Sequence, residues 1–227
     1  ILSMVTHDLK SPMTAVIGCL ELLEEDEFLS KDEKKRCIKS AKKASKSIMK
    51  LVEDISIMAK SEAGKEHVEY KNISNLKNIM EDVYNTFKYE MKIKSIDFKI
   101  DIDKDLPIVY WDIDKIQYHV LNNIISNAIK FTSYGGDITF KITSKNDYIK
   151  IKIKDNGIGI PKDKRKTIFE KYDTHNNKKV FKGTGLGLYN AYNFINKHNG
   201  TISVENGING KGTGFVLLIP IEPTKKV

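Results

Sequence analysis

Several features that mark common protein classes are scarce in this sequence of 227 residues. It contains two cysteines, one tryptophan and five prolines, and it has no long apolar run. The longest run, residues 216–221, is far shorter than the roughly 18 to 20 residues that cross a bilayer. We therefore expect no membrane contact in these residues. Cys19 and Cys37 lack the spacing of a metal site, and we expect them to be reduced thiols in a reducing cytoplasm.

The net charge of +8 suggests affinity for anions, with nucleic acid as the obvious candidate. The lysines, however, are spread along helix faces and alternate along strands, so we expect no nucleic-acid partner. Hydrophobic residues at 40% and charged residues at 30% are typical of an ordinary globular protein with one large or two small domains. Because the chain begins at Ile1 inside a helical pattern, we interpret it as a fragment of a longer protein.

The first 26 residues or so have the pattern of an amphipathic helix. Its apolar stripe consists of Leu2, Val5, Leu9, Val16, Leu20 and Leu23. At about 100° per residue, His7 lies nearly opposite this stripe, facing solvent. Asp8 follows it, and Ser11 lies one turn later on the same face. Pro12 should bend or loosen the helix close to His7, because its ring removes a donor and clashes with the preceding turn.

A second helix is predicted from Ser30, which forms a capping box with Glu33, to about Glu62. Its heptad stripe consists of Ile38, Ala41, Ser45, Ile48, Val52, Ile55 and Ala59. One hairpin is too small to bury both apolar stripes, whereas two hairpins can do so as a four-helix bundle. We therefore predict a homodimer through residues 1–62. A coiled-coil spacer without chemistry is the alternative.

Residues 63–71 are predicted to be a short linker, and residues 72–227 a second domain. Helices are expected at 75–92, 112–131 and 187–198, and strands at 96–102, 138–142, 149–153, 201–205 and 215–221. Helices on one face of a mostly antiparallel sheet form a two-layer α/β sandwich. The predicted fold class is therefore α+β, a helical hairpin followed by this sandwich.

One face of the helix 112–131 carries Asn123, Asn127 and Lys130, spaced by four and three residues. Two amides and an ammonium on one stripe suit a hydrated Mg²⁺ ion and phosphate oxygens. Asparagine is also common on ordinary helix surfaces, so this pattern alone is not specific.

Directly after the strand 149–153 come Asp155, Gly157 and Gly159. The glycines allow a flat ligand to approach, and a buried carboxylate can accept a hydrogen bond from an exocyclic amine such as that of adenine. A tight turn is the alternative.

A second glycine-rich run, Gly183 to Leu188, opens the helix 187–198. Its members are Gly183, Thr184, Gly185, Leu186, Gly187 and Leu188. Free amides at a helix N-terminus bind phosphate, although the Gly-Lys-Ser/Thr signature of a P-loop is absent. The polar segment 171–182 before it is predicted to be a mobile lid over the phosphates, or else an ordinary loop. The glycines at 210–214 are expected to form a hairpin turn that supports the ligand site.

Taken together and in order, these segments resemble the catalytic core of the sensor histidine kinases of two-component signalling. The matching boxes are residues 7–12, 123–131, 155–159, 168–172 and 183–188. The resemblance implies a dimerisation and histidine-phosphotransfer hairpin followed by a Bergerat-type ATP-binding domain. It also implies ATP and Mg²⁺ as cofactors and the receiver domain of a response regulator as partner.

For the hairpin, the resemblance implies that His7 is the phospho-acceptor and that Asp8 takes a proton from one imidazole nitrogen. The other nitrogen then acts as the nucleophile. Ser11 matches a position that the family uses to orient water when it dephosphorylates the regulator. Serine keeps the hydroxyl and leaves a phosphatase activity open.

For the second domain, the resemblance implies that Asn127 is the main Mg²⁺ ligand, with Asn123 near the phosphates. Lys130 would contact phosphate, Phe131 would pack near the nucleotide, and Asp155 would bind the adenine amino group. The glycine-rich run would shape the lid's hinge and the phosphate contacts.

Three other functions are alternatives to this one. Gyrase, Hsp90 and MutL share the ATP-binding fold but place a glutamate base where this chain has Asn123, which cannot take a proton. Anti-sigma serine kinases lack an upstream histidine hairpin. A dimeric scaffold that binds nucleotide without transferring phosphate remains the non-enzymatic alternative.

Overall fold

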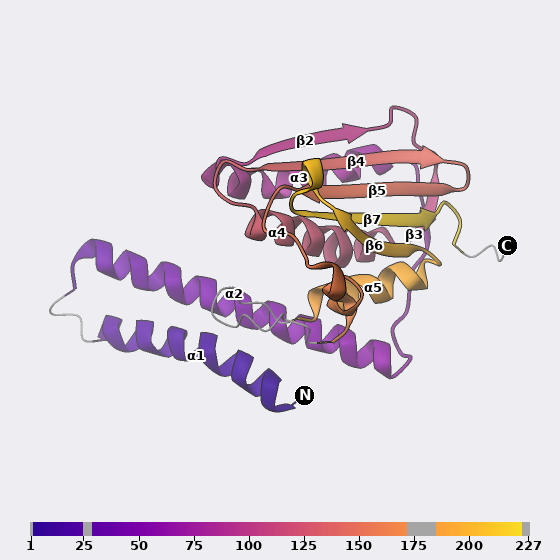
Figure 1. Cartoon of the computed structure of the whole chain (residues 1–227). Helices are drawn as coiled ribbons and strands as arrows, with labels where there is room; N and C mark the ends of the chain where they lie inside the picture. The colour runs from indigo at the N-terminus through magenta and orange to yellow at the C-terminus, as the bar shows by residue number, and fades with distance from the viewer. Residues whose placement is uncertain (1, 25–28, 172–184, 224–227) are drawn as a thin grey trace. The chain divides into compact units, whose positions relative to one another are not determined.

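The computed structural model describes residues 2–24, 29–171 and 185–223. Gly183, Thr184, the tip of the first hairpin and nearly all of the predicted lid lie outside these ranges. Contacts divide the chain between Lys65 and Glu66, inside the segment predicted as a linker. Figure 1 draws both units.

The first unit is a helical hairpin of α1 (Leu2–Glu24) and α2 (Lys31–Glu62). α1 continues as an α-helix through Pro12. α2 begins at the predicted capping box, which is confirmed. The Glu33 amide donates to Ser30 Oγ at 3.4 Å, and the Ser30 amide donates to Glu33 Oε2 at 2.9 Å. A left-handed glycine, Gly64 with φ 64°, follows the end of α2.

Apolar side chains remain accessible along both helices of this hairpin. Ile38 and Val52, from the heptad stripe predicted for α2, are 50% and 53% exposed, whereas the neighbouring Leu51 is buried. On α1 the half-exposed apolar residues are Met13, Ile17, Leu20 and Leu22. The spacing of Met13, Ile17 and Leu20 places these three residues on one helix face, which stays open on a single copy of the hairpin.

The second unit is built on a five-stranded sheet. The strand order is β2 (Asp97–Ile102), β4 (Asp137–Lys145), β5 (Tyr148–Asp155), β7 (Thr213–Pro220) and β6 (Thr201–Asn206). β2 runs parallel to β4, and the other pairs are antiparallel. Isoleucines alternate with lysines along β5, so that one face is buried and the other is half exposed, as predicted.

Helices α3 (Leu76–Ile93), α4 (Asn122–Phe131) and α5 (Gly187–Lys197) cover one face of this sheet (Figure 1). Fully buried side chains from both layers form the core, among them Met80, Val83, Ile116, Ile124, Phe140, Ile142, Ile151, Phe194 and Leu217. The predicted two-layer sandwich is therefore confirmed. The helices and the alternating strands fall close to the predicted positions.

Short elements were not predicted. β1 (Lys71–Ile73) pairs with β3 (Val109–Trp111) as a separate antiparallel ribbon, and strands of three residues carry no usable period. The 3₁₀ turns are η3 (Lys162–Lys164), η4 (Thr167–Phe169) and η5 (Ile208–Gly210).

The helix predicted over 112–131 is not uniform. It opens with a π-helical segment, η2 (Lys115–Leu121), and becomes α-helical at Asn122. A π-helix shifts the hydrogen-bonding partner of each amide by one residue, and such segments are often found at functional sites. No side-chain pattern in the sequence distinguishes the two.

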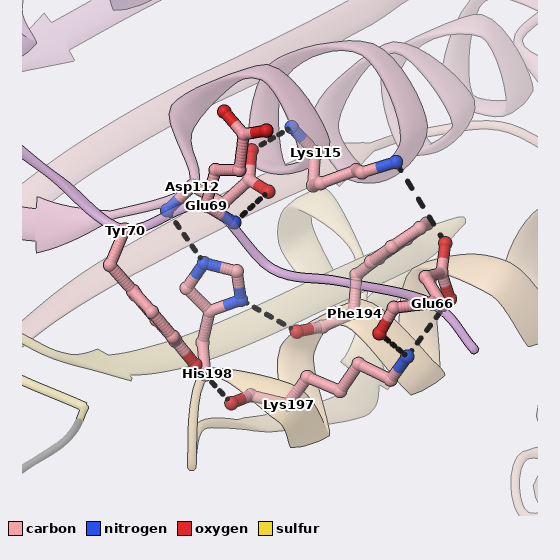
Figure 2. A network of polar contacts seen from close by, with 8 residues as sticks. All are labelled: Glu66, Glu69, Tyr70, Asp112, Lys115, Phe194, Lys197 and His198. Carbon is pink, nitrogen blue, oxygen red and sulfur yellow. Dashed lines mark hydrogen bonds and ion pairs between the residues drawn. The ribbon is translucent and has the colours of Figure 1, made fainter. Parts of the chain in front are cut away.

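The segment that opens the second unit is held by a polar network (Figure 2). The carboxylate of Glu66, whose side chain is 4% exposed, pairs with Lys197 at 3.0 Å and with Lys115 at 3.8 Å. The Tyr70 hydroxyl donates to the Lys197 carbonyl at 2.7 Å. Residues 66–70 are thus bound to α5 and to the start of η2.

A buried histidine lies at the centre of the same network (Figure 2). His198 accepts a hydrogen bond from the Asp112 amide at Nε2, at 3.1 Å, and its Nδ1–H donates to the Phe194 carbonyl at 2.8 Å. The Asp112 carboxylate accepts from the Glu69 amide at 2.9 Å and from the Lys115 amide at 3.2 Å. With both ring nitrogens engaged in this way, His198 is neutral and has a structural role.

Candidate active site

His7 is an exposed residue on α1, and its side chain is 80% accessible. Its Nδ1 lies 3.2 Å from Oδ1 of Asp8. In the tautomer that carries its proton on Nδ1, this N–H donates to the carboxylate, and the lone pair of Nε2 is left for reaction. Ser11 is exposed one turn later on the same helix. The structure therefore brings these three predicted residues together on one helical segment.

The side chain of Asn123 ties two helices of the second unit together. It is 6% exposed, and its Nδ2 donates to the His119 carbonyl at 2.6 Å and to the Gly187 carbonyl at 3.3 Å. His119 belongs to the π-helical segment and Gly187 is the first residue of α5. A Cβ at position 187 would lie only 3.1 Å from Asn123 Oδ1. Glycine at 187 therefore lets α5 begin directly against α4.

Asn127 and Lys130 continue the polar face of α4 toward solvent. Asn127 is half-buried. Within the described residues its side-chain amide makes no hydrogen bond to the protein. Lys130 is exposed, with its Nζ 4.9 Å from the centre of the Phe131 ring. An uncommitted amide oxygen and an ammonium on one face suit a hydrated cation and phosphate.

Asp155 ends β5 and is 3% exposed. Its Oδ1 accepts hydrogen bonds from the Gly157 amide at 2.8 Å and the Thr213 amide at 3.1 Å. Burial raises the pKa of the Asp155 carboxyl above its ordinary value, and the two backbone donors oppose that rise. In the described part of the chain no protein donor bonds Oδ2. An acceptor oxygen without a protein donor, on a carboxylate that is otherwise largely buried, fits a ligand N–H such as an exocyclic amine.

The loops around Asp155 pack backbone against backbone. A Cβ at Gly157 would lie 2.3 Å from the Phe131 carbonyl oxygen, and one at Gly212 would lie 2.2 Å from the Asp155 carbonyl oxygen. Gly159 has φ 74°, a conformation that favours glycine. The predicted glycines 157 and 159 therefore make the site compact, and the end of α4 touches the loop that carries Asp155.

The described part of the second glycine-rich run lies at the start of α5. Leu186 is fully buried, and Gly185 has φ 67°. Of the aromatic box predicted over 168–172, Ile168 is buried and Phe169 stacks on Tyr192 with ring centres 5.6 Å apart. These contacts pack the described residues on either side of 172–184 into the second unit.

Thr213 was not predicted as a site residue. Its amide donates to Asp155 Oδ1, so the residues around 210–214 hold the Asp155 carboxylate in place. The glycines on either side of Thr213 were the available signal, but the partner of its amide depends on the packing of β7 against β5.

Neither a dedicated metal centre nor a membrane-spanning helix occurs among the residues that the structure describes. No group of three histidine, cysteine, aspartate or glutamate side chains there could hold an ion. Mg²⁺ often binds through one protein oxygen, waters and substrate phosphates, and Asn127 fits that arrangement. In the same residues, every helix is too short or too polar to cross a bilayer.

One family model matches the first unit, and another matches the larger part of the second unit. Residues 1–64 match the family described as "His Kinase A (phospho-acceptor) domain". Residues 112–223 match "Histidine kinase-, DNA gyrase B-, and HSP90-like ATPase". The chain is thus of the class in which a phospho-acceptor hairpin is joined to an ATPase-type sandwich.

Relatives and solved structures agree. The adaptive-response sensory kinase SasA of Microcystis aeruginosa is 30% identical over 97% of this chain, which spans 58% of that relative. The sensor protein kinase WalK of Staphylococcus aureus is 29% identical over 96% of this chain, which spans 52% of that relative. The solved catalytic domain of the histidine kinase ThkA is 30% identical, with a TM-score of 0.62 over 70% of this chain and 99% of that one.

The fold of nearly the whole chain is also matched. The structure of the Acinetobacter baumannii histidine kinase AdeS has a TM-score of 0.72 over 95% of this chain and 98% of that one, at 24% identity. The chain belongs to the sensor histidine kinase family and comprises its catalytic core. It spans little more than half the length of SasA and WalK.

Proposed function

We propose that this chain is an ATP-dependent autokinase that phosphorylates His7 and passes the phosphoryl group to an aspartate of a response regulator. The observation that carries the proposal is the exposed His7 imidazole with Asp8 at its Nδ1, in a chain whose second unit has the nucleotide-binding fold. The resemblance stated from the sequence assigned the same two residues.

The ATP site that we propose consists of residues from α4, the Asp155 loop and the start of α5. Asp155 Oδ2 accepts from the adenine amino group, and Asn127 supplies an oxygen to Mg²⁺. Lys130 and Asn123 lie toward the phosphates, and Phe131 lies beside the nucleotide. The glycines 183, 185 and 187, with Thr184 and Leu186, shape the phosphate end. When bound, Mg²⁺ neutralises phosphate charge.

The transfer step needs little covalent chemistry from the protein. The lone pair of His7 Nε2 forms a bond to the γ-phosphorus, the bond from that phosphorus to the bridging oxygen breaks, and ADP leaves with the electron pair. The positive charge that develops on the imidazole is stabilised by Asp8, which accepts the Nδ1 proton. In-line positioning and charge neutralisation provide the remaining catalysis.

A response regulator and a second copy of the chain are the proposed partners. ThkA, whose catalytic domain was compared above, has also been solved in complex with the response regulator protein TrrA. The half-exposed apolar residues on α1 and α2 supply the surface for pairing two hairpins into a four-helix bundle. We place the chain in the cytoplasm. The exposed hydroxyl of Ser11 supports a second activity, dephosphorylation of the same regulator.

The test is incubation with γ-labelled ATP, with and without Mg²⁺, followed by acid or alkali treatment of the protein. We expect Mg²⁺-dependent label that acid removes and alkali does not, the behaviour of a phosphoramidate. Release of free phosphate without protein label would favour a simple ATPase. Nucleotide binding with neither outcome would favour the scaffold.

A further inference from the structure

Four consecutive carbonyl oxygens at the end of α4 all have hydrogen-bond donors. The last carbonyls of a helix have no partner within the helix, and a buried one is costly unless another group supplies a donor. The Phe131 oxygen accepts from the Ile158 amide at 3.4 Å. Lys94 Nζ donates to the other three at 2.7 Å, 3.1 Å and 2.8 Å, the oxygens of Ile129, Lys130 and Thr132.

The ammonium group of Lys94 suits this position in both number of donors and charge. It carries three N–H donors, one for each of the three carbonyls. A helix C-terminus carries a partial negative charge, which a cation stabilises. A neutral side chain of similar length could fill the space but could not supply three donors or the charge.

The backbone of Lys94 is itself fixed by the end of α3. Lys94 is the C-cap residue, and its amide donates to the Glu90 carbonyl at 3.2 Å. Its carbonyl accepts from the Gly135 amide at 2.9 Å, and Ser95, at φ 51°, turns the chain out of the helix. α3 and α4 lie on the same face of the sheet (Figure 1). The ammonium therefore joins the end of one helix to the end of the other.

The turn that Lys94 holds lies next to the proposed adenine pocket. The Phe131 carbonyl sits so close to Gly157 that a Cβ there would be 2.3 Å away. Gly157 in turn donates to Asp155 Oδ1. A displacement of the last turn of α4 would therefore move Lys130, Phe131 and the Asp155 loop together.

We propose that Lys94 is a positioning residue for nucleotide binding. By holding the C-terminal turn of α4, it sets the distance between the phosphate-facing side chains of that helix and the adenine acceptor Asp155. Lys94 caps α3, outside every motif that the sequence singled out. The inference rests on the proposed ATP site but not on transfer to His7.

The test compares two variants. Lys94→Met keeps the length of the side chain but removes its charge and its N–H donors, whereas Lys94→Arg keeps the charge and the donors. Lys88→Met, at an exposed lysine on α3, is the matched control. ATP dissociation constants are measured by calorimetric titration in Mg²⁺, thermal midpoints confirm folding, and autophosphorylation is resolved into KM and kcat.

We expect Lys94→Met to weaken ATP binding about tenfold, equivalent to about 1.4 kcal/mol. The variant should also raise KM for ATP with little change in kcat. Lys94→Arg should stay within about threefold of the wild type, and Lys88→Met should be unchanged. If Lys94→Met is unfolded at the assay temperature, Lys94→Gln takes its place under the same criteria.

The proposal is overturned if the folded Met or Gln variant binds ATP as the wild type does. It is also overturned if folded Lys94→Arg is as weak as Lys94→Met, or if kcat falls while KM is unchanged. If ATP affinity depends on Lys94 but His7 is never labelled, the result supports this inference and rejects the autokinase function. The two failures are thus distinguishable.

Discussion

The two units present the side chains that we propose as functional in opposite ways. In the second unit Asp155 and Asn123 are 3% and 6% exposed and are held by hydrogen bonds to backbone groups. In the first unit His7 is 80% exposed and contacts its sequence neighbour Asp8. A group that recognises a ligand gains from being preorganised in a dry site, whereas an acceptor that meets both ATP and a partner protein must be accessible.

The comparison is tested most strongly at Asp155. We expect Asp155→Asn to weaken ATP binding by about 10- to 100-fold, because a hydrogen bond to a charged acceptor contributes about 1.5–3 kcal/mol. Inorganic triphosphate should be unaffected, because it has no adenine amine. Titrations with ATP, GTP and triphosphate measure the difference, and Asp147→Asn, at an exposed turn, is the control. Equal losses for ATP and GTP would contradict adenine recognition.

The space around the backbone differs between the two units, as one glycine in each unit shows. A Cβ at Gly157 would be 2.3 Å from a backbone oxygen, whereas one at Gly18 on α1 would meet nothing within 4 Å. We expect Gly157→Ala to lower the free energy of unfolding by about 1–3 kcal/mol. Gly18→Ala should be neutral or stabilising by up to about 1 kcal/mol, because alanine favours a helix. Urea unfolding measures both, and similar losses would remove the contrast.

Asn127 tests whether an uncommitted amide in the second unit is a metal ligand. We expect Asn127→Ala to weaken ATP binding about tenfold when Mg²⁺ is present. ATP binding in the presence of a metal chelator should be unchanged, because the lost oxygen acts through the ion. Asn196→Ala, exposed on α5, is the matched control. A variant that retains wild-type affinity in Mg²⁺ would exclude this role.

The smallest effect concerns His198 and pH. Burial lowers the pKa of His198 below 6.5, while its hydrogen bond to Phe194 and the charge of Asp112 oppose that change. Between the lowered folded pKa and 6.5 the unfolded chain binds the proton more readily. The stabilisation is therefore complete above about pH 6.5 and declines as the pH falls toward the folded pKa.

His198→Gln can keep an acceptor for the Asp112 amide and a donor for Phe194, but it does not titrate. We expect the thermal midpoint of this variant to fall less between pH 7.5 and pH 5.5 than that of the wild type. Exposed His67→Gln is the control. An identical decline in His198→Gln would assign the pH dependence to other groups.

The sequence predicted those parts of the fold in which one period repeats over several residues. The alternation of isoleucine and lysine predicted β5, and the Ser30–Glu33 capping box predicted the start of α2. The three-residue strands β1 and β3 and the π-helical turn η2 have no such pattern, because tertiary packing determines them.

The candidate site divides in the same way. Residues that we propose to bind or react through their own side chains, such as His7, Lys130 and Asp155, stand in recognisable spacings. Thr213 contacts the site through its backbone amide, and Lys94 through three backbone carbonyls at the end of α4. Such contacts depend on which segments meet in space, and a single sequence does not record them.

The most direct test of the central claim is labelling of His7→Gln with γ-labelled ATP and Mg²⁺, beside His67→Gln and with ATP affinity measured on each. The account predicts no label on His7→Gln, full label on His67→Gln and unchanged affinity for both. Label retained on His7→Gln would contradict the assignment of His7 as the phospho-acceptor.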